Sequence, residues 1–453
     1  MSKITVHRIF ADGLTPVLAY DALRRATAGP SFLLESVTGG ERWGRYSILG
    51  YRPRRQLVLS PRQGRDPFAE LAERASFVVP EDAGIAGRLA CSYFGYLAYD
   101  ICTQTLKRPA HSTTEPLAHL LSETTIVLFD NLEQTITVAS LHRDDADRAL
   151  EDLSRVGRLR ELALPDRSLL AGEVEALTSD EDFEAAVRRV QEYIRAGEGG
   201  QFVLARTFVT PSHGTDAFDV YRAMRVLSPT PYMYFLDLPA TEGAPALQIA
   251  GASPETLVRW QDGIATIRPI AGTRRRGRTH EEDLALEAEL LADPKEQAEH
   301  VMLIDLATSD VSQVATFGSV SVPRRAFIER YSHVMHIVSE VQGQTRPDVG
   351  PWDVIRAAFP AGTLTGAPRP RAIEIIHELE PRPRGIYGGA IGWIGARELD
   401  LAIAIRTVIH REGRFEVSAG AGIVDASVPA LESKETRNKA KAALSAIRAA
   451  RGS

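Results

Sequence analysis

Apolar positions in the first third of the chain fall in short runs separated by Gly, Pro, Asn and Asp. One run covers Leu89–Tyr99, and two others, Thr124–Phe129 and Gln134–Ser140, flank the polar pair at 130–131. Short apolar runs bounded by turn residues are typical of strands, and two such runs joined by a short polar turn are typical of a hairpin. We therefore predict a sheet-rich lobe over residues 1–175.

A charged and loosely patterned segment follows this lobe. The stretch 142–176 has helix-like spacing over Asp145–Leu162 and then contains Pro165 and Gly172. Such a change of pattern favours a connection between lobes over a core element. We expect a second lobe to cover residues 176–453.

The second lobe mixes helical and strand patterns. Ser179, followed three residues later by Asp182, precedes apolar residues at helical spacing, which predicts a capped helix. Apolar runs between turn residues predict strands at Leu247–Ala252, Thr256–Trp260, Ile264–Ile270, Leu401–His410 and Arg414–Ser418. Because the elements do not alternate as regular strand–helix–strand units, the expected class is α+β, with two lobes and large, mostly antiparallel sheets flanked by helices.

Two further helices have clear start signals. Asp293 stands at a capping position and Pro294 at the first helical position of one of them. Pro429 opens the other, which is rich in Ala, Lys and Arg and is expected to reach the C-terminus.

Each of these two helices has a pair of carboxylates three residues apart. Glu296 and Glu299 share one face of the first helix, and Glu432 and Glu435 share one face of the second. A hard cation such as Mg²⁺ prefers oxygen ligands and needs only one or two protein carboxylates when the substrate supplies the rest. The alternative is that both pairs lie on solvated helix faces.

The composition excludes several classes of protein. The chain has 453 residues, 44% of them hydrophobic and 25% charged, with a formal charge of −6. This is an ordinary globular composition without the basic excess of a nucleic-acid-binding protein, and no apolar run is long enough to span a membrane. Without a signal-peptide pattern, a cytoplasmic protein is expected. The cysteines, Cys91 and Cys102, have no metal-ligand spacing and are expected to be free thiols.

Several small or charged residues could bind an anion. The glycine-rich turn 362–368 could bring backbone amides close to a carboxylate, and Arg406 and Lys439 could pair with one. His336 could act as a general acid or base. Taken singly, these residues are better explained as tight turns, surface charges and a structural histidine.

Taken together, seven short sequence motifs, in the order in which they follow one another along the chain, resemble those of chorismate-utilising enzymes. Among these enzymes they are most similar to the anthranilate-forming branch. They are Arg268–Gly277 (RPIAGTRRRG), Asp293–His300 (DPKEQAEH), Tyr331–Ile337 (YSHVMHI), Pro360–Pro368 (PAGTLTGAP), Ile403–Thr407 (IAIRT), Ala419–Val424 (AGAGIV) and Glu435–Ala440 (ETRNKA). The resemblance is specific from about residue 180 to 445 and looser in the N-terminal third. It implies an Mg²⁺-dependent lyase that converts chorismate and ammonia to anthranilate and pyruvate in tryptophan biosynthesis.

The resemblance also implies roles for individual residues. Glu299 and Glu435, with Glu296 and Glu432 close by, would hold Mg²⁺ and through it the ring carboxylate of chorismate. The residues expected to bind the rest of the substrate are Arg406, Tyr387, Gly420, Gly422, Lys439 and Thr365.

Two residues are expected to move protons. Glu255 in GASPE matches the acid that protonates the leaving 4-hydroxyl, which requires burial or a neighbouring negative charge to raise its pKa. His336 would assist the loss of pyruvate.

Two positions separate the branches of the family. By the resemblance, Gln201 occupies the position at which isochorismate and salicylate synthases both have a lysine that activates water. Ala271 occupies the position at which many aminodeoxychorismate synthases have a lysine. Both differences favour ammonia as nucleophile and anthranilate as product. The alternatives are an enzyme that stops at aminodeoxychorismate or amino-deoxyisochorismate, and a non-catalytic paralogue that binds tryptophan or the amidotransferase.

The resemblance extends to regulation and to a partner. The residues that look like the two parts of a tryptophan feedback site are Leu34, Glu35, Ser36, Pro231, Tyr232 and Met233. Because nothing in the chain resembles a glutaminase, the family implies a separate glutamine amidotransferase subunit that supplies ammonia, and hence a hetero-oligomer. One departure from the family pattern, Gly199-Gly200 before Gln201, is expected to loosen the wall of the substrate pocket.

Overall fold

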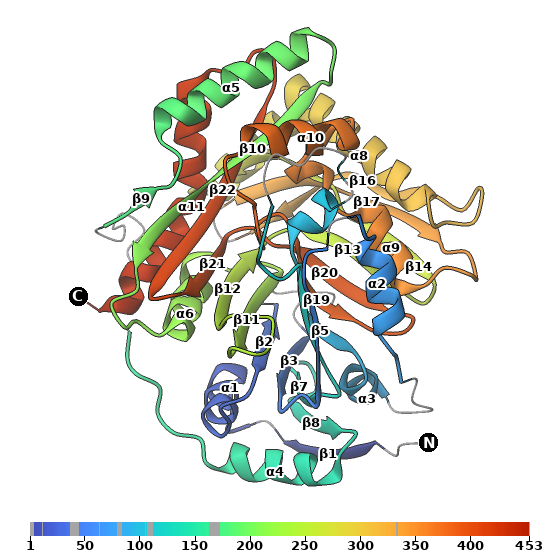
Figure 1. The fold of residues 1–453 in the computed structure, drawn as a ribbon, viewed down its shortest axis with the longest axis vertical. Coiled ribbons are helices and arrows are strands. Elements are labelled where there is room, and N and C mark those ends of the chain that lie inside the picture. Colours follow the sequence, from blue (N-terminus) through green and yellow to red (C-terminus); the bar gives the residue numbers. More distant parts are fainter. Residues whose placement is uncertain are drawn as a thin grey trace.

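The described residues of the computed structural model form two large sheets with helices packed around them (Figure 1). These residues are 4–10, 12–36, 45–62, 64–78, 84–104, 106, 112–162, 173–331 and 334–452. All strand pairs recorded within the two sheets are antiparallel. The expected α+β class with large antiparallel sheets is confirmed.

The first sheet has 12 strands among the described residues. Their spatial order is β1-β8-β7-β3-β2-β11-β12-β21-β22-β10-β18, and β9 also pairs with β10. The strands are β1 (Thr5–Phe10), β2 (Ser31–Glu35), β3 (Tyr46–Tyr51), β7 (Thr125–Asp130), β8 (Thr135–Ser140), β9 (Glu175–Ala176), β10 (Gln201–Pro211), β11 (Tyr232–Leu238), β12 (Leu247–Ser253), β18 (Gly366–Ala367), β21 (Thr407–Arg411) and β22 (Arg414–Ile423).

The second sheet has 10 strands in the described part of the chain. The order is β15-β17-β14-β13-β20-β19-β5-β6-β4, and β16 pairs with β17. The strands are β4 (Arg55–Leu59), β5 (Tyr93–Leu97), β6 (Ala118–Ser122), β13 (Thr256–Gln261), β14 (Ile264–Ile267), β15 (Ile270–Arg275), β16 (Ser321–Arg330), β17 (Val334–Gln344), β19 (Ala390–Ile394) and β20 (Leu399–Ile403).

The helices cover the outer faces of the sheets and the ends of the strands (Figure 1). They are α1 (Pro16–Arg25), α2 (Pro67–Arg74), α3 (Gly84–Ala90), α4 (Arg143–Ser154), α5 (Asp180–Arg195), α6 (Ala217–Leu227), α7 (His280–Ala292), α8 (Pro294–Ser312), α9 (Pro351–Ala358), α10 (Arg369–Leu379) and α11 (Pro429–Arg451), with 3-10 turns η1 (Tyr99–Thr103) and η2 (Gly362–Leu364). No helix among the described residues is both long and apolar enough to cross a membrane.

The capping signals read from the sequence are confirmed. Ser179 accepts a hydrogen bond from the backbone N–H of Asp182 at the start of α5, and Asp293 accepts two from the first turn of α8. The hairpin flanking residues 130–131 is β7 and β8. Local hydrogen bonds between near neighbours therefore set these element boundaries.

Other expected elements are shorter or interrupted. The run Leu89–Tyr99 begins as the end of α3, and the helix expected over Asp145–Leu162 ends at Ser154. The run Ile264–Ile270 divides at Pro269 into β14 and the start of β15, because Pro has no N–H to donate to a strand ladder.

The sheets do not follow the boundary expected at residue 175. The first sheet joins β2 from the N-terminal segment to β11, and the second joins β5 to β19. Both sheets therefore contain strands from both expected lobes. The division into 1–175 and 176–453 stays a prediction, and the expected connection lies partly outside the described residues.

One part of the core lies between the two sheets. Phe32 of β2 stacks on Phe94 of β5 with ring centroids 4.3 Å apart, and Tyr234, Ile249 and Ile391 belong to the same buried cluster. Aromatic and aliphatic burial of this kind is the main favourable term in sheet packing. It holds the two sheets at a fixed distance.

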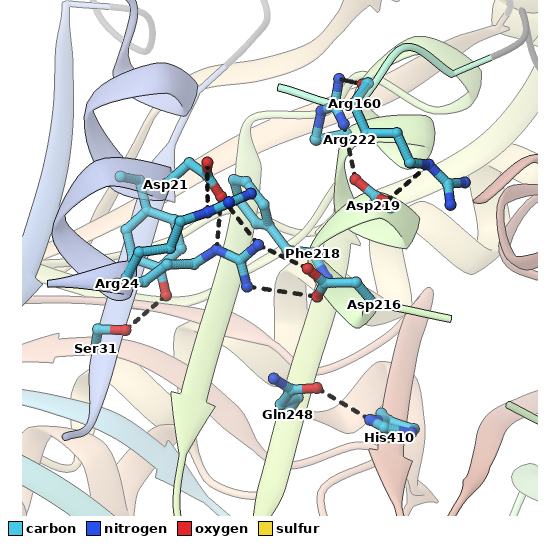
Figure 2. Close-up of polar contacts among 12 residues, drawn as sticks. Asp21, Arg24, Ser31, Arg160, Asp216, Phe218, Asp219, Arg222, Gln248 and His410 are labelled. Atoms are coloured by element: carbon cyan, nitrogen blue, oxygen red, sulfur yellow. Dashed lines mark hydrogen bonds and ion pairs between the residues drawn. The ribbon is translucent and has the colours of Figure 1, made fainter. Parts of the chain in front are cut away.

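The helix α6 is held against α1 by a charged contact (Figure 2). Arg24 of α1 donates to Asp21 of its own helix at 2.9 Å and to Asp216 at 2.6 Å, and it lies over the ring of Phe218. Asp216 is also the N-cap of α6. The contact fixes the start of α6, which further along carries Tyr221, whose hydroxyl donates to Glu35.

Candidate active site

The chain passes from one sheet to the other at several points, and two of these lie next to each other. Between β12 and β13 it crosses through residues 254–255, and between β20 and β21 it crosses through residues 404–406. The backbone N–H of Ile403 donates to the carbonyl of Glu255 at 3.0 Å, and that of Ala252 donates to the carbonyl of Arg406 at 3.2 Å. The two crossings therefore lie side by side and bring Glu255 near Arg406.

The expectation that Arg406 lies within one strand is wrong. The apolar run Leu401–His410 is two strands, β20 and β21, which belong to different sheets. At the break Arg406 has a φ of 50°, in the left-handed region that non-glycine residues adopt rarely. This conformation takes the residue out of the ladder at a cost of order 1 kcal/mol or more.

Glu255 has the properties of an acid that keeps its proton near neutral pH. Burial raises its pKa to about 7, while the hydroxyl of Thr363, Arg406 and Lys439 act in the opposite direction. Thr363 Oγ1 donates a hydrogen bond of 2.8 Å to Glu255 Oε1. Because Oε1 is the acceptor, Oε2 is the oxygen left to carry the proton.

A cavity of about 110 Å³ lies in front of Glu255. Its polar lining comes from Glu255, Gln201, Glu299 and Thr363, and its apolar wall comes largely from α8. Gln201 stands at the start of β10 and hydrogen-bonds to Glu299. The described lining contains no lysine or histidine, so the amide of Gln201 and not a basic side chain stands beside Glu255.

The hydroxyl that reaches this cavity belongs to Thr363 and not to Thr365. Thr365 is fully buried, and its Oγ1 donates to the carbonyl of Ala361 at 2.9 Å. The Thr365 hydroxyl therefore hydrogen-bonds within its own turn. Thr363 was not singled out from the sequence, although its place two residues away in the same Gly-Thr-Leu-Thr-Gly turn was a usable signal.

Glycines on β22 allow close packing beside Gln201. A Cβ at Gly420 would lie 2.8 Å from Tyr387 Oη, and a Cβ at Gly422 would lie 2.6 Å from Gln201 Nε2. The N–H of Gly420 hydrogen-bonds to the Tyr387 hydroxyl, and its carbonyl accepts from Lys439 Nζ at 3.0 Å. Four of the expected substrate-binding residues are thus gathered around one strand segment.

The expected loosening by Gly199-Gly200 is not seen in the described backbone. A Cβ at Gly199 would lie 2.6 Å from the carbonyl oxygen of Ala367, and the N–H of Gly200 donates to that same oxygen at 3.1 Å. Glycine at 199 permits the tight approach of β18 to the start of β10.

The four carboxylates lie on α8 and α11, and a lysine of each helix is close enough to act on a glutamate of the other. Burial and the charge of Glu296 raise the pKa of Glu299, and burial raises that of Glu432, with a further contribution from Glu435. Among the described residues, no three His, Cys, Asp or Glu side chains are close enough to hold one metal ion.

Basic side chains balance part of this negative charge. Lys439 Nζ pairs with Glu435 at 2.7 Å, and Arg274 lies 3.7 Å from Glu296. Lys295 and Lys439 each lower the pKa of both Glu299 and Glu432. An oxygen-only donor set in which the pKa values of Glu299 and Glu432 are raised fits a hard divalent cation, which would relieve the same repulsion.

His336 and Arg406 share a second cavity, of about 310 Å³. The ring Nδ1 of His336 lies 3.0 Å from the carbonyl of Gly272, which makes Nδ1 the donor and leaves Nε2 as an acceptor. Burial lowers the pKa of His336, so the ring is neutral at pH 7. Residues 332–333 of the expected string Tyr331–Ile337 lie outside the described residues.

Arg406 is a largely buried cation without an ionic partner of its own. Burial lowers the pKa of its guanidinium, and among the described residues it forms no ion pair. Glu255 and Tyr331 act in the opposite direction on this pKa, but only in their ionised forms. A guanidinium in this state is suited to a carboxylate ligand, which it can bind through two parallel hydrogen bonds.

All six residues expected at the feedback site line one cavity between the two sheets. Its volume is about 620 Å³, and the six are Leu34, Glu35, Ser36, Pro231, Tyr232 and Met233. Glu35 accepts from the Tyr221 hydroxyl at 2.6 Å and pairs with Arg225 at 3.1 Å. The buried hydroxyl oxygen of Ser36 has no hydrogen-bond partner among the described residues.

The cavity is connected to the crossing that contains Glu255. The Tyr232 hydroxyl lies 2.9 Å from Thr256 Oγ1 and donates to Asp400 at 2.8 Å. Thr256 directly follows Glu255 in the chain. A change at Tyr232 can therefore reach the acid through one hydrogen bond and one peptide unit.

Comparisons with known proteins agree with these features. Residues 29–445 match the model of the chorismate binding enzyme family. The chain is 43% identical to anthranilate synthase component 1 of Acinetobacter calcoaceticus, in an alignment that covers 96% of this chain and 93% of that protein. It is 39% identical to anthranilate synthase component 1 of Mycobacterium tuberculosis, in an alignment that covers 98% of this chain and 92% of that protein.

Two solved structures have the same fold. Anthranilate synthase component I from Streptococcus pneumoniae superposes with a TM-score of 0.77 at 33% identity, covering 97% of this chain and 99% of that one. The menaquinone-specific isochorismate synthase from Escherichia coli superposes with a TM-score of 0.74 at 19% identity, covering 98% and 95%.

Replacing Thr363 tests the environment of Glu255. The Thr363→Val variant loses a donor that stabilises the ionised carboxylate, so the pKa of Glu255 should rise above its value of about 7. The measurement is a ¹³C NMR titration of side-chain-labelled glutamate, with Glu255→Gln to assign the signal. Thr365→Val is the matched control and should leave the titration unchanged. Equal shifts in both variants would contradict the assignment.

Proposed function

The chain belongs to the family of chorismate-binding enzymes, and we propose that it converts chorismate and ammonia into anthranilate and pyruvate for tryptophan biosynthesis. The observation that carries this proposal is the pairing of Glu255, an acid with a pKa near 7, with Gln201 in one cavity. An acid is needed to expel the hydroxyl, and an amide cannot deprotonate water. The relatives that are similar over nearly the full chain are anthranilate synthase components, which supports the same reaction.

Glu255 would serve as the general acid of the first step. Ammonia attacks C2 of chorismate, the ring double bonds shift, and the bond from C4 to its hydroxyl breaks. Oε2 of Glu255 gives its proton to the departing oxygen so that water leaves, while Oε1 stays bound to Thr363. General acid catalysis of this kind contributes roughly 100- to 10,000-fold in rate.

The second step eliminates pyruvate and forms the aromatic ring. A proton must leave C2, and the enolpyruvyl methylene must gain one as the C3–O bond breaks. His336 would assist this step, because its neutral ring has Nε2 available as an acceptor. Its place beside Arg406 in one cavity supports a role close to the enolpyruvyl group.

The substrate is a dianion and needs two anion sites. Arg406 would bind the enolpyruvyl carboxylate, because its buried guanidinium lacks an ionic partner among the described residues. Tyr387, with the backbone at Gly420 and Gly422, would complete that site, and Lys439 would lie toward the ring carboxylate. Fixing both ends of the substrate orients C2 and C4 for reaction.

The ring carboxylate would be bound through Mg²⁺. Glu299 and Glu435 would hold the ion, with Glu296 and Glu432 next to them, since these carboxylates provide the oxygen-only set that Mg²⁺ prefers. When bound, the ion supplies the positive charge that lets a carboxylate substrate approach four glutamates. A substrate carboxylate and water would complete the coordination shell.

Tryptophan would inhibit the enzyme by binding between the sheets. The cavity combines apolar surface from Met233 and Pro231 with the carboxylate of Glu35 and the free hydroxyl of Ser36, which suits an amino acid with an indole side chain. The hydrogen bond between Thr256 and the Tyr232 hydroxyl supports communication with Glu255. Bound tryptophan would favour an inactive arrangement of the two crossings.

A separate glutamine amidotransferase subunit would supply the ammonia in a hetero-oligomer. Both cysteines lack the setting of a glutaminase nucleophile, since Cys91 is buried with a raised pKa and Cys102 is likewise held as the neutral thiol. Free ammonium salts should replace the partner in vitro.

The direct test is product analysis. The purified chain is incubated with chorismate, MgCl₂ and an ammonium salt, and products are separated by chromatography and identified by anthranilate fluorescence. Anthranilate that disappears with EDTA is the expected result. An amino-deoxy product that retains the enolpyruvyl group would instead support the sister reactions, and unchanged chorismate would support a binding paralogue.

Replacing the acid should separate chemistry from binding. Glu255→Gln keeps the shape of the side chain but removes its proton, so kcat should fall by about 100-fold or more while chorismate and Mg²⁺ still bind. Steady-state kinetics and calorimetric titration measure the two effects. Turnover at the unaltered rate would exclude Glu255 as the acid.

Enlarging Ser36 should remove feedback inhibition. A phenyl ring in Ser36→Phe fills part of the cavity, and overpacking by about 1–3 kcal/mol corresponds to roughly 5- to 150-fold in inhibitor concentration. The readout is the tryptophan concentration that halves anthranilate formation. Ser312→Phe, at an exposed position near the end of α8, is the control and should keep normal inhibition. Unchanged sensitivity of Ser36→Phe would place tryptophan elsewhere.

A further inference from the structure

One buried arginine lies outside the cavities in front of Glu255 and His336 but touches the helix that bears two of the glutamates. The Arg206 side chain is fully buried on β10 and lies between the rings of Phe183 and Phe208, 4.9 and 5.2 Å from their centroids. A buried guanidinium is costly unless its donors are satisfied. The contacts that satisfy Arg206 therefore constrain whatever they join.

Most of these contacts go to the first turns of α11. Arg206 donates to the carbonyl and the hydroxyl of Ser433 at 2.8 and 2.9 Å, and to Thr436 Oγ1 at 2.9 Å. Ser433 directly follows Glu432, and Thr436 directly follows Glu435. The guanidinium thus binds the helix on the face adjoining the two carboxylates.

Asp180, the first residue of α5, completes the arrangement. It accepts from Arg206 at 2.6 Å, from the Ser433 hydroxyl at 2.7 Å and from Arg437 at 2.6 Å. These donors hold the pKa of Asp180 well below its usual range, so the carboxylate stays ionised. The planar fork of Arg206 can reach Asp180 and Ser433 together, whereas a lysine ammonium could satisfy only part of the set.

The start of α11 lacks a side-chain N-cap. Its N-cap residue, Val428, has no side chain to cap the first turn, and Glu432 and Glu435 repel each other. The preceding turn is bound by Gln191 of α5, which donates to the carbonyls of Asp425 and Ser427. Rotation of α11 about its axis is opposed by the contacts of Arg206.

We propose that Arg206, paired with Asp180, is a positioning residue that fixes the rotation of α11 so that Glu432 and Glu435 face α8 and can bind the divalent cation. The inference rests on the proposed metal site. Arg206 would not contact the substrate. Its ion pair with Asp180 at the start of α5 would help to hold the metal-binding glutamates in place. Outer contacts of this kind commonly change metal affinity by roughly 10- to 100-fold.

The test is calorimetric titration with MgCl₂ in the presence of chorismate and without ammonia, so that no turnover occurs. Arg206→Lys and Ser433→Ala should each raise the Kd for Mg²⁺ on the order of tenfold, with far-UV circular dichroism unchanged. The KM for chorismate should rise at low Mg²⁺ and return toward the wild-type value at saturating Mg²⁺. Wild-type Kd values in both folded variants would overturn the inference.

Arg451→Met is the matched control. Arg451 ties the far end of the same helix to the same strand, through a 2.9 Å hydrogen bond to Thr210. Its loss should lower the melting temperature and leave the Kd for Mg²⁺ unchanged. An equal loss of Mg²⁺ affinity in this variant would mean that any loosening of α11 suffices, which contradicts a specific role for Arg206.

A ligand variant separates this inference from the proposed function. Glu435→Gln should abolish Mg²⁺ binding in the same titration. If Glu435→Gln binds Mg²⁺ as the wild type does, the metal site itself is wrong and the role of Arg206 falls with it. If Glu435→Gln abolishes binding and the Arg206 and Ser433 variants do not weaken it, the metal site stands and only the positioning role is overturned.

Discussion

The paired crossings between the two sheets are the constraint on which the site depends. Antiparallel pairing brings β12 beside β21 in one sheet and β13 beside β20 in the other, so the links between them must also run side by side. Residues in these links leave the strand ladders, which frees their side chains from the alternation of a sheet. Glu255 and Arg406 owe their proximity to this topology, and the hydrogen bonds exchanged by the two links keep the spacing fixed.

Buried charged side chains that hold the surrounding structure have ionic partners, whereas those of the candidate site have none in the described part of the chain. Arg384, like Arg206, is fully satisfied: it pairs with Glu380 at 2.6 Å and donates to the carbonyl of Leu364, which holds the turn that presents Thr363. Arg406 has no such partner among the described residues, and Glu255 keeps its proton because of burial. Arg384 and Arg206 therefore stabilise the fold, whereas the candidate site retains unpaired groups that a dianionic substrate could pair with.

The same crossings join the catalytic cavity to the larger cavity between the sheets. Leu34 and Tyr232 belong to one sheet and Asp400 to the other, so a ligand there contacts both. Since the Tyr232 hydroxyl reaches Thr256, next to Glu255, the relative position of the sheets and the position of the acid are linked.

The sequence by itself determined the features that depend on near neighbours. Capping residues located the starts of α5 and α8, turn residues located the β7–β8 hairpin, and spacing put the glutamates on common helix faces. The order of motifs identified the family and most of the candidate site. Only the tertiary structure decided that Leu401–His410 divides between two sheets, that Thr363 and not Thr365 reaches the acid, and that Arg206 binds α11. These facts depend on contacts between residues as many as 230 positions apart, and the alternation of apolar residues is the same whether a strand stays in one sheet or crosses to another.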